Sequence, residues 1–226
     1  MQNKNRNDIR INGLGSTSGG SFNLIQINGK GDINGDIECN ELQINGLGCM
    51  NGNAKAETVR VAGKSEVTGK LTGHVVIIDG MMEAHGGIVA QSIENRGMLK
   101  INKDCDAENF ASHGGFTVAG LLNAGKITIE VYGPCKAKEI GGENIDVRFG
   151  NAFGLRKFVE ALFPGWTRGL SAETIEGDRI YLEGTTAKIV RGKNVELGPG
   201  CVIDTIEYKE TFKEAADSKV KESKKI

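Results

Sequence analysis

Residues 24–40 read LIQINGKGDINGDIECN and residues 41–57 read ELQINGLGCMNGNAKAE, so the pattern that starts at Leu24 starts again at Glu41. Further lines follow at the same spacing, over 58–74, 75–91, 92–108, 109–125 and 126–142. The stretch 8–23 forms another line that is shorter by a single position. A fixed short period is typical of a solenoid, in which each unit buries its apolar face against its neighbours.

Aligning the lines reveals a strand pattern inside each of them. Apolar residues fall on even positions and charged residues mostly on odd ones, which is the alternation of a strand with one buried face. The second position holds Ile25, Leu42, Val59, Val76, Ile93, Phe110 and Ile127, and the tenth holds Ile33, Met50, Val67, Ala84, Ile101, Val118 and Cys135.

Glycine recurs at the sixth and twelfth positions, which we interpret as corners between short strands. Several of these glycines follow asparagine, and Asn-Gly is a strong turn signal. We expect them to supply positive φ or a tight backbone. The corner glycines are Gly29, Gly35, Gly46, Gly52, Gly63, Gly69, Gly80 and Gly86.

These patterns predict an all-β fold, a right-handed parallel β-helix of about 17-residue coils with a short amphipathic helical insertion. The predicted organisation is a polar tail at 1–7, β-helix repeats at 8–150, the insertion at 151–170, further coils at 171–208 and a charged tail at 209–226. The last segment is low in apolar residues, so we expect it to be mobile or loosely packed.

The insertion follows the i, i+3, i+4, i+7 spacing of an amphipathic helix. One interpretation is a helix that covers the flank of the solenoid; the other is a docking face for a partner or a membrane surface. The apolar residues concerned are Leu155, Phe158, Val159, Leu162, Phe163 and Trp166.

Composition disfavours several functional classes. The net charge is −1, so no broad basic surface for nucleic acid is expected. The five cysteines lack CxxC spacing and are interpreted as reduced thiols, with Cys39, Cys105 and Cys135 as core residues. His74, His85 and His113 occupy three different line positions and do not predict a metal site. We therefore expect no catalytic residues, no metal and no cofactor, and a protein that is not an enzyme.

The lines at 24–57, together with AKIVRGKNVELGPGCVIDTIEY at 187–208, resemble the bactofilins, which are polymer-forming bacterial cytoskeletal proteins. The resemblance implies a right-handed β-helix that joins end to end into filaments without nucleotide. It also implies roles as a scaffold in cell shape, envelope organisation or motility.

The outermost coils each lack one neighbour, and an identical end is a simple way to satisfy an open edge. The expected partner is therefore the chain itself, alongside a related paralogue and envelope or membrane proteins. A polar start without a signal peptide predicts a cytoplasmic protein, with peripheral attachment to the inner face of the membrane as an option. The predicted polymer-end residues are Ile9, Ile11, Ile203, Ile206 and Tyr208.

Two alternatives remain. One is a β-helix that binds a partner without polymerising. The other is a hexapeptide-type acyltransferase, suggested by VELGPG at 195–200 but disfavoured because the period differs from that of strict hexapeptide coils and no histidine follows His113.

Overall fold

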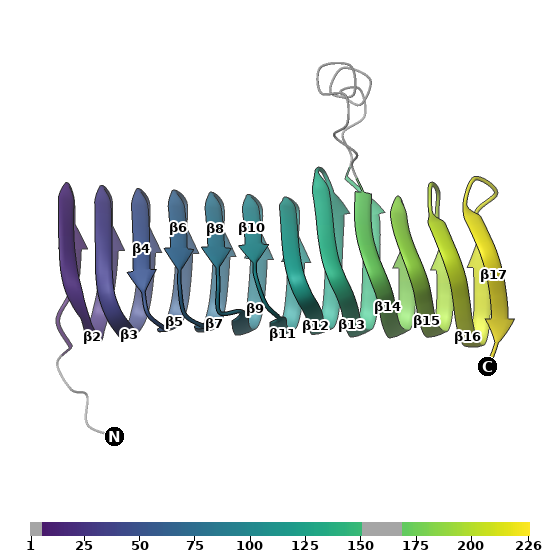
Figure 1. Cartoon of the computed structure of the whole chain (residues 1–226), viewed down its shortest axis with the longest axis horizontal. Coiled ribbons are helices and arrows are strands. Elements are labelled where there is room, and N and C mark those ends of the chain that lie inside the picture. The colour runs from purple at the N-terminus through teal and green to yellow at the C-terminus, as the bar shows by residue number, and fades with distance from the viewer. Residues whose placement is uncertain (1–5, 151–168) are drawn as a thin grey trace, which may run out of the picture. The chain divides into compact units, whose positions relative to one another are not determined.

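The computed structural model describes residues 6–150 and 169–226, which fall into two compact units, 1–107 and 108–226. The described residues form strands and contain no helix. Unit 1 holds the strands from β1 to β10, β11 crosses the boundary, and unit 2 holds the rest (Figure 1). The strands are β1 (Ile9–Ile11), β2 (Leu14–Ile27), β3 (Lys30–Ile44), β4 (Leu47–Asn51), β5 (Ala54–Val61), β6 (Lys64–Val67), β7 (Leu71–Ile78), β8 (Met81–Ala84), β9 (Ile88–Asn95), β10 (Met98–Ile101), β11 (Cys105–Ser112), β12 (Gly115–Val131), β13 (Pro134–Phe149), β14 (Gly169–Leu182), β15 (Thr185–Leu197), β16 (Val202–Glu214) and β17 (Lys219–Lys225).

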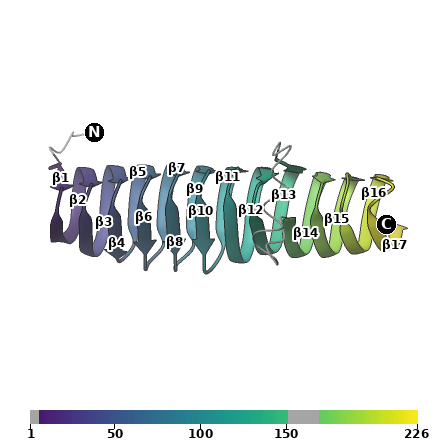
Figure 2. The ribbon, with the colours of Figure 1, turned by 90° about the horizontal axis from the view of Figure 1, so that it is seen from above.

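Unit 1 is a parallel β-solenoid whose coil has the predicted period. Strands β4, β6, β8 and β10 form one stack, and β5, β7 and β9 form another (Figure 2). Met50 pairs with Val67, and Val67 pairs with Ala84, so each pairing joins residues that are one period apart in the sequence. The parallel β-solenoid expected from the repeat is therefore confirmed, while its right hand stays a prediction.

The core of unit 1 consists of the predicted even positions. Ile25, Leu42, Val59, Val76 and Ile93 are 0–1% exposed and pair in series across the coils. The tenth position of the lines is equally buried, from Ile33 to Ile101. Each coil therefore covers the apolar residues of the next coil. A single repeat cannot bury its own apolar face, so it needs these neighbours to fold.

The glycine corners of unit 1 are formed by close stacking, which corrects the expectation of positive φ at most of them. Among the predicted corner glycines, only Gly35 has positive φ, at +112°. At Gly63, an added Cβ would collide with the backbone carbonyl of Gly46, far inside the 3.0 Å below which real Cβ contacts essentially do not occur. The same collision recurs at Gly29, Gly46 and Gly80. These glycines are needed because successive corners lie directly on one another.

Unit 2 is also a parallel β-solenoid, but its coil length changes. Ile127 pairs with Ile145, which makes that coil longer than the period of unit 1, whereas Ile180 pairs with Val195, which makes that coil shorter. The register also shifts between Val118 and Leu121, so Val118 pairs with Ala137 and not with Cys135. The predicted alignment of the tenth position was thus wrong in the last line. The cause is that this coil is longer than the constant period assumed.

The charged segment after Tyr208 differs from the mobile tail expected from its composition. Residues 209–214 continue β16, and β17 pairs in parallel with β16, Ile203 lying opposite Val220. Most of its side chains are exposed, which explains the polar composition. The predicted insertion at 151–170 lies outside the described residues, apart from Gly169 and Leu170, which begin β14.

Candidate functional site

The N-terminal edge of unit 1 contains two residues predicted for self-assembly. Ile9 and Ile11 pair with Ile25 and Ile27, which are both 0% exposed. Ile9 and Ile11 themselves are only half-buried, because within the described chain β1 has a strand on one side only. The apolar core of the solenoid therefore continues up to an edge that no described strand covers.

Short contacts fix β1 in place. The backbone N–H groups of Asn23 and Asn28 donate to the carbonyls of Asn7 and Ile11, at 2.9 and 2.8 Å. The side-chain amide of Asn23 donates to Asp8 Oδ1 at 2.9 Å. Arg10 lies 3.5 Å from the other carboxylate oxygen of Asp8. The edge is thus an ordered strand with one acidic and one basic side chain on its outward face.

The C-terminal residues predicted for self-assembly do not form an open edge. Ile203 and Ile206 are 1% and 0% exposed, because β17 pairs with β16 beyond them. Tyr208 is half-buried, and its ring centroid is 5.7 Å from that of Phe212. Placing Ile203 and Ile206 at a polymer end was therefore incorrect, since the sequence argument ended the solenoid one strand too early.

The outer strand of unit 2, β17, is rich in lysine. Its sequence is KVKESKK; Val220 is half-buried, and the other side chains are exposed. Lys221 and Lys224 form ion pairs with Asp204 and Glu207 on β16, at 2.6 and 2.8 Å. Exposed lysines on an outer strand are a common protection against edge-to-edge pairing.

The apolar residues predicted for partner or membrane contact, from Leu155 to Trp166, lie outside the described residues. No helix in the described ranges is long and apolar enough to cross a bilayer.

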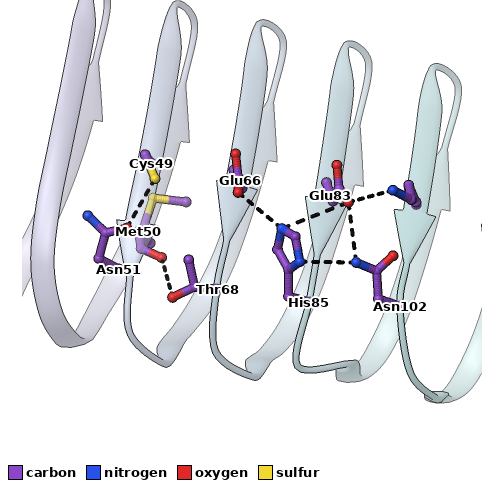
Figure 3. A network of polar contacts seen from close by, with 9 residues as sticks. Cys49, Met50, Asn51, Glu66, Thr68, Glu83, His85 and Asn102 are labelled. Carbon is purple, nitrogen blue, oxygen red and sulfur yellow. Dashed lines mark hydrogen bonds and ion pairs between the residues drawn. The ribbon is translucent and has the colours of Figure 1, made fainter.

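A polar network crosses the outer face formed by β4, β6, β8 and β10 in unit 1 (Figure 3). His85 Nε2 is 3.0 Å from Glu66 Oε1 and 3.8 Å from Glu83 Oε1. Its Nδ1 is 3.0 Å from the side-chain amide of Asn102. Lys100 donates to Glu83 at 2.7 Å, and this hydrogen bond lowers the pKa of Glu83. The network links neighbouring coils at their surface.

The sequence argument missed this network because it compared His85 only with the other two histidines, as candidate metal ligands. The repeat itself contains the signal. Glu66 and Glu83 both occupy the ninth position of their lines, and His85 and Asn102 both occupy the eleventh. The glutamates lie on the strands β6 and β8, and His85 and Asn102 come directly after β8 and β10. No group of three histidine, cysteine or acidic side chains in the described chain is arranged to hold a metal ion.

The cysteines behave as core residues, as predicted. Cys39, Cys105 and Cys135 are 0–2% exposed, and burial raises the pKa of each thiol to about 12. A thiol with so high a pKa is protonated at neutral pH and is a poor nucleophile.

Comparison with known proteins finds two curated relatives, both from Bacillus subtilis (strain 168). The chain is 42% identical to the uncharacterized protein YhbF over 108 residues. This match covers 47% of this chain and 42% of YhbF. It is 42% identical over 94 residues to the uncharacterized protein YhbE, covering 40% of this chain and 37% of that protein. The matched region is thus about two fifths of the length of each relative. No protein-family model and no solved structure matches the chain.

Proposed function

We propose that this chain is a non-enzymatic structural scaffold that assembles with copies of itself through the edges of its solenoid. The observation that carries the proposal is the N-terminal edge of unit 1, where half-buried Ile9 and Ile11 continue a fully buried core to an open strand. Such an edge presents unpaired N–H and C=O groups and is a template for another strand.

The rest of the surface supports a structural role. Ion pairs join neighbouring coils, such as Glu176–Arg191 at 3.3 Å and Asp178–Lys193 at 2.8 Å. Asparagines form matching ladders, as in the hydrogen bonds from Asn28 to Asn12 and from Asn45 to Asn28, each 2.8 Å long. These contacts stiffen a repeat and do not converge on a reaction centre.

The finer proposal follows from the resemblance to bactofilins. The chain would form nucleotide-independent cytoskeletal filaments in the bacterial cytoplasm and act there in cell shape, envelope organisation or motility. Its partners would be further copies, a related paralogue and envelope proteins, without a cofactor or nucleic acid.

Electron microscopy of the purified protein, combined with sedimentation velocity, tests the proposal. We expect concentration-dependent assembly and filaments without added nucleotide. A protein that stays monomeric at the highest attainable concentration would contradict it.

A second candidate is a binding scaffold that does not polymerise, and one observation favours it. Leu47, Met81 and Met98 are 51%, 53% and 40% exposed and lie in one ladder across β4, β8 and β10, with Lys64 of β6 between the first two. Exposed apolar side chains that gather on one face can mark an interaction site. A monomeric protein in the assembly experiment would favour this candidate.

A further inference from the structure

The backbone of β1 determines how a second strand can approach it. Asn7 and Ile11 direct their carbonyls toward β2, where they accept hydrogen bonds from Asn23 and Asn28. Backbone groups of successive strand residues point to opposite edges, so the N–H and C=O groups of Asp8 and Arg10 point to the open side. The edge therefore offers two residues, each with one donor and one acceptor.

A second copy can place the same strand antiparallel against this edge in only a few registers that keep apolar side chains on one face. If Arg10 lies opposite Arg10 of the second copy, like charges face each other. If Asp8 lies opposite Asp8, like charges again meet. If Ile9 lies opposite Ile9, each Asp8 faces an Arg10 across the interface. Opposite charges directly across a strand pair are stabilising and like charges are destabilising, so the third register is favoured.

We infer that the N-terminal edge of unit 1 binds a second copy of this chain through an antiparallel β1–β1 pair with Ile9 on the two-fold axis. In this register Asp8 and Arg10 form the hydrogen-bonded pairs, which use the donors and acceptors that point outward. Ile9 forms the central, non-hydrogen-bonded pair on the apolar side. The inference rests on the proposed self-assembly and specifies its partner, register and charge pairs.

Charge reversal tests the register. Asp8→Arg and Arg10→Asp each place two like-charge pairs across the interface, and we expect each to weaken the dimer about tenfold by sedimentation velocity. The double variant Asp8→Arg/Arg10→Asp restores opposite charges and should return to within about twofold of the original affinity. Glu57→Arg and Lys70→Asp make the same charge changes at exposed positions elsewhere on unit 1 and should leave the affinity unchanged.

A cysteine on the two-fold axis gives an independent test that does not depend on charge. A non-hydrogen-bonded antiparallel pair places its Cα atoms about 4.5 Å apart, which a disulfide can span. In a Cys49→Ser background, Ile9→Cys should form a disulfide-linked dimer under mild oxidation. Leu14→Cys, at an 86% exposed side chain that is off the axis, should cross-link much less.

The outcomes separate this inference from the proposed function. Two results would overturn the register and leave self-assembly standing. One is that filaments form equally well with Asp8→Arg. The other is that the double variant does not regain the original dimer affinity although its circular dichroism remains β-rich. Stronger cross-linking through position 14 than through position 9 would also overturn it. A wild-type chain that never associates would overturn both.

Discussion

Replacing Gly63 by alanine should destabilise unit 1 by about 2–4 kcal/mol through steric conflict at the corner. The new Cβ would collide with the carbonyl of Gly46 and lie 2.7 Å from that of Asn45, and neither backbone atom can move independently. Relieving the conflict separates two coils. It weakens the hydrogen bonds from Ala62 and Gly63 to Ile44, at 2.8 and 3.0 Å, and from Lys64 to Gly46, at 2.8 Å. Three backbone hydrogen bonds at about 1 kcal/mol each account for the estimate.

Urea unfolding followed by circular dichroism measures the effect, and two variants make the interpretation specific. Gly13→Ala lies at the equivalent corner of the first coil, where an added Cβ meets nothing within 4 Å, so it should be neutral or slightly stabilising. Gly63→Asn also adds a Cβ, and asparagine tolerates positive φ, so a similar loss of stability in this variant would show that the Cβ contact and not the backbone angle is responsible. A Gly63→Ala protein within about 0.5 kcal/mol of the original, or an equal loss at Gly13→Ala, would refute stacking as the cause.

Three other changes have clear expected outcomes. Ser65→Ala should raise the urea midpoint, because the Ser65 hydroxyl is buried and has no hydrogen-bond partner among the described residues; a lower midpoint would contradict this. Ile206→Asp should unfold the last coils of unit 2, whereas Val202→Asp, at a 45% exposed position, should be tolerated; thermal melting distinguishes them. The hydrogen bond from Lys224 lowers the pKa of Glu207, so its stabilisation is present above about pH 4.5 and lost as the pH falls through the lowered value. Glu207→Gln should therefore make stability less sensitive to acid, and an unchanged pH profile would contradict the assignment.

The fold of unit 1 could be predicted because one period determines both its pairing and its core. Once Ile33 and Met50 are aligned one period apart, the inward and outward faces of every coil follow from alternation. The cysteines were assigned to the core by the same argument. The conformation of Gly63 was not predictable in this way, because a periodic glycine is compatible with positive φ or with close stacking, and the sequence pattern is the same for both.

In unit 2 the sequence argument failed where coil length changes. A constant period pairs Cys135 with Val118, but the structure pairs it with Phe116, because this coil is longer than the constant period and its register shifts again between Val118 and Leu121. Phe116 is also the residue whose ring packs edge-on against Phe110, with centroids 5.4 Å apart. Packing of two large rings thus accompanies the irregular coil, and a single sequence has no pattern that locates such a shift.

The error at the C-terminal strand bears most directly on function. β17 was interpreted as a solvated tail because it is mostly lysine and contains a single apolar residue, yet an outermost strand needs apolar residues on one face only, and there Val220 covers Ile203. The lysines that made it resemble a tail are the residues that protect an exposed edge. β1 carries no lysine, and Asp8 just before it and Arg10 within it are complementary to the same two residues of a second copy. Self-assembly should consequently begin at β1, and any contact through β17 must overcome the repulsion between its lysines.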